Sequence, residues 1–290
     1  MSFAGTHTAL VTPFRGGKFD ADAFRALIED QVAGGITGIV PVGTTGESPT
    51  LDHEEHSEVI RTAVEAAAGR CVVMAGTGSN ATSEAISLTV EAARLGADAA
   101  LLVAPYYNKP SQEGIYRHFR AVAESVKIPL ILYSIPGRCG VEIGVETVLR
   151  LAKDCPNIRT IKESGGSVER VSQLRAAAGP DFEILSGDDS LTIPFLSVGA
   201  VGVISVASNL FPAEVSEMVR LWLDGDTAGA QTLHRRFYAL FKDLFIEPNP
   251  VPVKYGLSLR GKMSAQVRLP LCEMSASNAA RVRQTLEALQ

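Results

Sequence analysis

The stretch DAALLVA, residues 98–104, is an almost uninterrupted apolar run that stops at Pro105. Seven other runs resemble it, and amphipathic helical stretches lie between them. Apolar residues at nearly every position, rather than at alternate ones, are typical of parallel strands buried on both faces. The eight runs recur roughly every 20 to 35 residues, the spacing of a strand–helix unit. They lie at residues 7–12, 35–42, 70–76, 98–104, 129–134, 158–162, 182–187 and 200–206.

This repeat predicts a (β/α)₈ TIM barrel with a helical appendage at the C-terminal end. An open doubly wound sheet is the alternative, but no GxGxxG follows the first run, which favours the closed barrel. The strand pattern stops after Ser205, and the chain from about Pro212 reads as helical, with a break at EPNPVP, residues 247–252. We therefore expect a catalytic barrel over residues 1–224 and a helical region over 225–290.

Two helix starts have local signals. Asp52 with Glu55 three residues later predicts a capping box. Asn80 precedes the run 84–96, which ends on Gly96, a typical C-cap glycine.

Composition excludes several classes of protein. The 290 residues are 46% hydrophobic and 20% charged, with a net charge of −5 and scattered basic residues, so we expect neither a nucleic-acid nor a membrane partner. The beginning of the chain has no signal-peptide pattern and no apolar run reaches about 18 residues, so we expect a cytoplasmic protein. The cysteines form no CxxC pair, which favours free buried thiols over disulfides or a zinc site; they are Cys71, Cys139, Cys155 and Cys272.

Lys162 closes the run 158–162 and is followed by Glu163, Ser164 and two glycines. Catalytic groups of such barrels gather at the C-terminal strand ends, and burial disfavours the ammonium form, so a lysine here is a candidate Schiff-base nucleophile. The alternatives are a lysine that extends to the rim or one that pairs with Glu163. Other strand ends converge on the same mouth and favour the nucleophile.

Tyr133, at the fifth strand end, is a candidate proton carrier that needs a neighbour such as Thr44 or Thr45; a core tyrosine is the alternative. The turn 43–47, GTTGE, can present backbone N–H groups and hydroxyls to a carboxylate, or it is an ordinary loop. Arg138 suits bidentate capture of a second carboxylate, or it is a surface arginine.

Together, GTTGE (43–47), YSIPGRCG (133–140), IKES (161–164) and SGDD (186–189) resemble the pyruvate-dependent class I lyases and aldolases. The resemblance spans essentially the whole chain, including APYYNKPSQEG (104–114), GAVGVISV (199–206) and EPNPVPVKY (247–255). It is closest to the branch that condenses pyruvate with L-aspartate-4-semialdehyde to 4-hydroxy-tetrahydrodipicolinate, the first committed step of diaminopimelate and lysine biosynthesis. The resemblance implies no metal and no organic cofactor.

The family pattern implies that Lys162 forms an imine with pyruvate and that Thr44, Tyr107 and Tyr133 relay protons. Tyr107 would act in a neighbouring subunit of a homo-oligomer, expected to be a homotetramer. Thr45 belongs to the expected substrate-binding turn, and Arg138 would bind the carboxylate of the aldehyde substrate. Gly187 and Ile204 match backbone positions that line the pyruvate pocket.

The arginine separates this branch from its sister aldolases, which act on N-acetylneuraminate or 2-keto-3-deoxy sugar acids and are the alternative function. A barrel that only senses a keto acid is the alternative from another class. Around Arg138 this chain departs from the pattern, with Ser134, Gly137 and Cys139 where Asn, Ser and Thr are more common, which concerns loop stiffness and substrate affinity.

A second site involves His53 and His56, which share a face of a helix. They are a weak metal pair without a third ligand, or two exposed histidines. The resemblance adds another reading, feedback inhibition by free L-lysine at a subunit interface. The matching positions are Ser48, His53, His56, Asn80, Glu84 and Tyr106.

Overall fold

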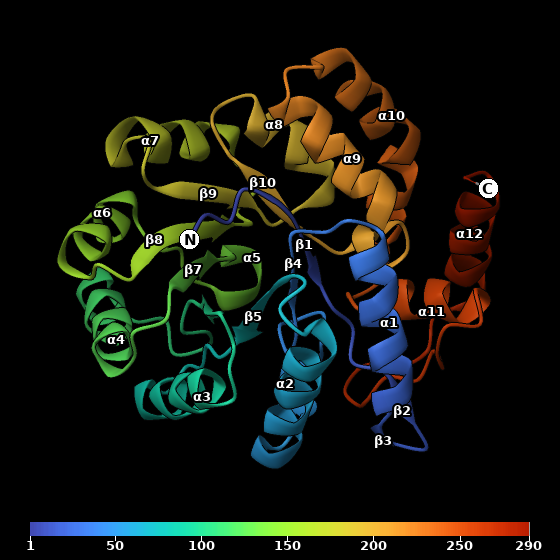
Figure 1. The fold of residues 1–290 in the computed structure, drawn as a ribbon, viewed down its shortest axis with the longest axis horizontal. Coiled ribbons are helices and arrows are strands. Elements are labelled where there is room, and N and C mark those ends of the chain that lie inside the picture. Colours follow the sequence, from blue (N-terminus) through green and yellow to red (C-terminus); the bar gives the residue numbers. More distant parts are fainter. Residues whose placement is uncertain (290) are drawn as a thin grey trace.

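The computed structural model describes residues 1–289 and is a closed barrel of eight parallel strands surrounded by helices (Figure 1). The barrel closes where β1 pairs with β10, in a register that runs from Gly5↔Gly202 to Thr8↔Ser205. Each predicted run overlaps one strand, so the TIM barrel is confirmed. The strands are β1 (Gly5–Ala9), β4 (Gly38–Val40), β5 (Val72–Gly76), β6 (Ala99–Val103), β7 (Leu130–Ser134), β8 (Ile158–Glu163), β9 (Glu183–Ser186) and β10 (Gly202–Ser205).

Helices alternate with these strands and cover the outside of the barrel (Figure 1). They are α1 (Ala21–Ala33), α2 (His53–Ala67), α3 (Thr82–Arg94), α4 (Gln112–Ser125), α6 (Val145–Asp154), α7 (Val168–Ala178), α8 (Thr192–Leu196) and α9 (Pro212–Leu223). Short elements fill several loops: α5 (Pro136–Cys139) and the 3₁₀ turns Ser48–Thr50, Asp189–Leu191 and Ala207–Asn209. The sequence did not predict the hairpin of β2 (Phe14–Arg15) and β3 (Lys18–Phe19), whose two-residue strands are too short to show a period.

The helix-start predictions are partly correct. The Asp52 carboxylate accepts the Glu55 backbone N–H at 2.8 Å, but the Glu55 side chain bonds Arg268 instead of completing the capping box. Asn80 is not a cap, because α3 begins after Ala81 and Asn80 uses its carbonyl to accept Asn108 Nδ2 at 2.9 Å. Gly96 ends α3 as predicted, with a φ of +92° that an L side chain rarely adopts.

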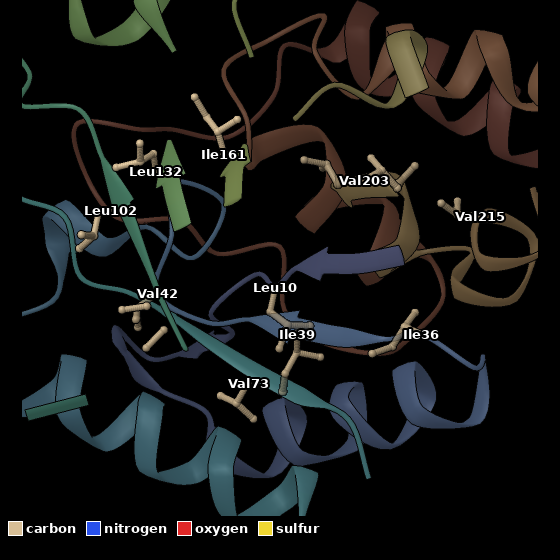
Figure 2. Packing of buried hydrophobic residues seen from close by; sticks show 14 of the residues in the cluster. Leu10, Ile36, Ile39, Val42, Val73, Leu102, Leu132, Ile161, Val203 and Val215 are labelled. Carbon is tan, nitrogen blue, oxygen red and sulfur yellow. The ribbon is translucent and has the colours of Figure 1, made fainter. Parts of the chain in front are cut away.

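Two apolar cores explain why the strands are hydrophobic at nearly every position. The outer core lies between strands and helices, where Leu132 of β7, Ile161 of β8 and Val203 of β10 pack (Figure 2). The inner core fills the barrel and includes Tyr133 and Ile204. Because successive side chains of a strand alternate, β7, β9 and β10 each supply both cores.

The predicted C-terminal helices are confirmed: α10 (Thr227–Asp243), α11 (Val251–Leu259) and α12 (Ala276–Glu287). The division at residue 224 falls between α9 and α10 and stays a prediction. The break ends earlier than expected, because α11 begins at Val251 and Pro252 occupies its first turn, where a missing N–H is tolerated.

Three of the four free cysteines, Cys71, Cys139 and Cys155, are buried as predicted, and Cys272 is exposed. Burial raises the pKa of the Cys139 thiol to about 11. None of the helices within residues 1–289 combines the length and apolar character needed to cross a membrane.

Candidate active site

The C-terminal ends of the strands surround a cavity of about 430 Å³. Residues from widely separated parts of the chain meet there, as the convergence of parallel strand ends requires. Six of the predicted catalytic and substrate-binding residues line it: Thr44, Thr45, Tyr133, Arg138, Lys162 and Gly187.

Lys162 lies inside the barrel and is only 6% exposed. It pairs in register with Tyr133 of β7, and its Nζ lies 4.2 Å from the centroid of that ring. Neither structural alternative holds, since Lys162 does not extend to the rim and forms no ion pair among the described residues. Glu163 instead accepts Arg170 Nε at 2.8 Å. The amine is therefore buried beside open volume without a carboxylate to hold it.

Gly187 provides the space that Lys162 occupies. A Cβ at this position would lie 2.8 Å from Lys162 Cε and 1.8 Å from Ser164 Oγ, so any side chain would displace one of them. The Gly187 N–H is fixed by donation to the Glu163 carbonyl at 2.8 Å. Steric clearance, rather than a flexible backbone, is the reason for glycine here.

Tyr133 is 5% exposed, and its ring packs in the inner core while the residue lines the cavity. Thr44 lines the same cavity from the turn after β4. Within residues 1–289 no hydrogen bond joins the Tyr133 hydroxyl to Thr44, so the proton relay stays a prediction.

The turn 43–47 is tightly folded. The Gly46 N–H donates to the Gly43 carbonyl at 3.1 Å, and the Glu47 N–H donates to the Thr44 carbonyl at 3.1 Å. A Cβ on Gly46 would lie 2.9 Å from the Val42 nitrogen, whereas Gly43 has free space. The turn therefore requires glycine at position 46 and leaves room on its Gly43 side.

The sequence reading missed the way in which the C-terminal region holds this turn. Lys254 of α11 is fully buried and donates to Glu47 Oε1 at 2.5 Å and to the Thr12 carbonyl at 2.8 Å. Asn249 Nδ2 donates to Thr45 Oγ1 at 2.9 Å. The only sequence signal was a lysine inside the apolar run that follows the proline-rich break.

Asp189 of the SGDD turn was also missed as a structural anchor. Its buried carboxylate accepts Ser205 Oγ at 2.5 Å and the N–H groups of Val206 and Ala207 at 3.0 Å. Burial raises its pKa to about 6. Asp189 thus ties the end of β9, near Gly187, to the end of β10.

Arg138 lies on α5 at the cavity and its side chain makes no ion pair among the described residues. Gly137 beside it has no atom within 4 Å of a Cβ position, and Ser134 is fully buried, with its Oγ 3.5 Å from the Ile143 nitrogen. The guanidinium is available to a ligand, and the unusual glycine leaves open space next to it.

Two of the predicted catalytic and substrate-binding residues do not line the cavity of this chain. Tyr107 is 88% exposed with a φ of +72°, so its phenol points to no site within the subunit. Ile204 is buried in the inner core. Their predicted roles stay predictions.

Five of the six candidate lysine-binding residues line the same cavity. His53 Nε2 lies 3.0 Å from Glu84 Oε1, and Glu84 also accepts the Ser79 hydroxyl. The hydrogen bond from Ser79, followed by that from His53, lowers the pKa of Glu84. Ser48 and Tyr106 line the cavity too, whereas Asn80 does not.

His56 differs from its neighbour. It is 5% exposed, its Nε2 lies 2.9 Å from the Gly76 carbonyl oxygen, and burial lowers its pKa. The interpretation of two exposed helix histidines is therefore wrong for His56. Within residues 1–289, no three His, Cys, Asp or Glu side chains are grouped to hold a metal ion.

Comparison with known protein families identifies the family of this chain. Residues 2–289 match the family described as the Dihydrodipicolinate synthetase family. The chain belongs to this family. The predicted resemblance is confirmed, and the protein is an enzyme, a lyase of the dihydrodipicolinate synthetase family.

Relatives match over their full length. The 4-hydroxy-tetrahydrodipicolinate synthase of Nitratidesulfovibrio vulgaris (strain DP4) is 50% identical over 288 residues, which cover 99% of each chain. That of Aquifex aeolicus (strain VF5) is 50% identical over 285 residues, covering 98% of this chain and 97% of the relative.

Solved structures of the same family have the same fold as this chain. The 4-hydroxy-tetrahydrodipicolinate synthase of Methylacidiphilum fumariolicum SolV has a TM-score of 0.98 at 55% identity, covering 99% of this chain and 96% of that one. The synthase of Cyanidioschyzon merolae, solved with lysine bound, has a TM-score of 0.96 at 43% identity, covering 99% and 98%.

Proposed function

We propose that this lyase condenses pyruvate with L-aspartate-4-semialdehyde to give 4-hydroxy-tetrahydrodipicolinate, the first committed step of diaminopimelate and lysine biosynthesis. The observation that carries the proposal is the Lys162 amine, which is buried, borders the cavity and has no carboxylate partner among the described residues. The names of full-length relatives at about half identity support the same reaction.

The reaction begins when the neutral Lys162 amine attacks the keto carbon of pyruvate and water leaves to form an imine. The pyruvate carboxylate would lie against the turn 43–47, where the Thr45 hydroxyl and backbone N–H groups are donors. The imine withdraws electrons, so the pyruvate methyl group loses a proton and becomes an enamine.

The enamine carbon then adds to the aldehyde carbon of the second substrate. Arg138, exposed at the cavity without an ion pair in this chain, would hold the carboxylate of that substrate. The substrate amine next attacks the imine carbon and displaces Lys162 as the ring closes. Tyr133 and Thr44 would carry the protons, and Tyr107, exposed on this chain, would join the relay of a neighbour in a homotetramer.

Borohydride trapping tests the imine. The protein is incubated with pyruvate, reduced, digested and mapped by mass spectrometry. The proposal expects one adduct, on Lys162. No adduct, or an adduct on another lysine, would overturn it.

Substrate competition tests the partner. The proposal expects turnover with aspartate semialdehyde and little with N-acetylneuraminate, because Arg138 provides a carboxylate partner and the arginine distinguishes the two branches. Faster turnover of N-acetylneuraminate would assign the chain to the sister aldolases instead.

We further propose feedback inhibition by L-lysine. The Glu84 carboxylate, which contacts His53 and accepts the Ser79 hydroxyl, can bind an ammonium group. In addition, a related synthase has been solved with lysine bound. Activity should fall with millimolar lysine in the parent and much less in Glu84→Gln. Glu91→Gln is the matched control, because Glu91 lies on the same helix, pairs with Arg94 and does not line the cavity. Activity unaffected by lysine would contradict the proposal.

A further inference from the structure

The C-terminal region contributes directly to the cavity. Asn249 and Phe245 line it together with Lys162, although both belong to the segment between α10 and α11. Asn249 is 6% exposed, and its amide nitrogen donates to Thr45 Oγ1 at 2.9 Å. A buried amide from one region therefore contacts a hydroxyl of the expected carboxylate-binding turn.

The direction of this hydrogen bond matters. A hydroxyl has one proton to donate and lone pairs to accept, whereas an amide NH₂ group only donates. Because Asn249 Nδ2 donates, the Thr45 oxygen accepts and its proton stays free. Among residues 1–289 this is the only hydrogen bond of the Thr45 hydroxyl, and Thr45 faces the cavity.

The turn that carries Thr45 is held at a second point by the same region. Lys254 donates to Glu47 Oε1 at 2.5 Å, and the Arg268 backbone N–H donates to Glu47 Oε2 at 3.0 Å. Glu47 itself has a φ of +54°, a conformation that needs such support. With the backbone fixed, the remaining freedom of Thr45 is the rotation of its hydroxyl, which Asn249 restricts.

We propose that Asn249 is a positioning residue that keeps the Thr45 hydroxyl proton directed to the carboxylate of the bound keto acid. This inference rests on the proposed pyruvate chemistry and adds a role for the C-terminal region in substrate affinity. Asn249 acts through Thr45 and takes no part in the bond-making steps.

Asn249→Asp is the sharpest variant, because the shape is kept while the donor becomes an acceptor. The Thr45 hydroxyl would then donate to the new carboxylate instead of to the substrate. A hydrogen bond to a charged group corresponds to a change of about 10- to 100-fold in the pyruvate concentration that half-saturates trapping. The maximal rate at saturating pyruvate should change much less than this concentration.

The added charge would also repel pyruvate without any role for Thr45, so the variant is made in two backgrounds. T45V removes the hydroxyl but keeps the shape. Charge repulsion acts in both backgrounds, whereas the hydrogen-bond effect needs the hydroxyl. We expect N249D to weaken pyruvate saturation about 10-fold more in the parent than in T45V. Equal effects in the two backgrounds would overturn the inference.

Further variants separate folding from positioning. Gln266→Glu adds the same charge elsewhere in the C-terminal region and should leave pyruvate saturation unchanged. Asn249→Ala removes the donor without adding charge and should weaken saturation about 3-fold in the parent and not in T45V; if N249D does not fold, equal effects of N249A in both backgrounds overturn the inference. Absence of any Lys162 adduct in the parent protein would instead contradict the proposed function itself.

Discussion

Two buried lysines lie in different regions of this protein, and their surroundings differ in partners and in free space. Lys162 at the end of β8 and Lys254 in α11 are 6% and 0% exposed. Each places its Nζ 4.2 Å from an aromatic ring centroid, Tyr133 for the first and Phe14 for the second. Only Lys254 has a carboxylate partner, Glu47, at 2.5 Å.

The difference teaches that burial alone does not make a lysine a nucleophile. Lys254 is enclosed, hydrogen-bonded and paired, so its amine has neither a free direction nor space for a ketone. Lys162 has no such partner among the described residues and borders a cavity. The Lys254 amine fixes a turn, whereas the Lys162 amine is free to react. The same substitution at both positions separates these roles.

The largest effect is expected for Lys162→Met on catalysis. Methionine keeps the length and apolar stem but cannot form an imine, so turnover should fall at least about 10³-fold and the borohydride adduct should disappear. The free energy of unfolding should stay the same or rise, since no paired charge is lost. Steady-state kinetics and denaturant titration measure the two quantities. Residual turnover within 10-fold of the parent would contradict the assignment.

Lys254→Met should show the opposite pattern. It leaves Glu47 buried without its cation, which typically costs about 3–5 kcal/mol of unfolding free energy, while the adduct on Lys162 still forms at high pyruvate. Lys262→Met is the matched control, because Lys262 pairs with Asp30 at 2.8 Å on the surface and such pairs contribute about 1 kcal/mol or less. Similar losses in both variants would mean that the buried pair has no special role.

Gly187→Ala tests the space around Lys162. The new methyl group would overlap Ser164 Oγ and Lys162 Cε, and a displacement of about 1 Å at a reacting atom costs roughly 10²-fold in rate. The rate of adduct formation should fall accordingly. Gly137→Ala, next to Arg138 and free of neighbours within 4 Å, should leave that rate unchanged. A slow G137A variant would indicate a general intolerance of the cavity rim.

The two lysines also differ in whether the sequence alone predicts their roles. Lys162 was found because it ends one of eight runs buried on both faces, and parallel strand ends must converge. The same logic located Tyr133, Thr44, Thr45 and Gly187. Lys254 was missed because its partner Glu47 is 207 positions away and no local period joins them.

Other failures have similar causes. The Asp52 cap follows from a local spacing and is correct, whereas Asn80, which also precedes a helical run, is not a cap because α3 begins at Thr82 with Ala81 as its N-cap. His56 looked exposed by its spacing, yet the end of β5 covers it. The role of Tyr107 depends on another subunit, which one chain cannot position.

The smallest effect concerns the pH dependence of the Lys254 pair. Burial lowers the pKa of Lys254 from 10.5 to about 8, more than Glu47 raises it. Below pH 8 the amine is protonated in both the folded and the unfolded chain. Between pH 8 and 10.5 the unfolded chain binds more protons, so this group adds stability as pH rises through that window and loses it as pH falls back through 8. The difference in unfolding free energy between the parent and Lys254→Met should therefore widen from pH 8 to 10.5. If the difference in unfolding free energy narrowed over this range, Glu47 would hold the Lys254 proton more strongly than burial expels it. The ion pair with Glu47 would then be the feature that distinguishes Lys254 from Lys162.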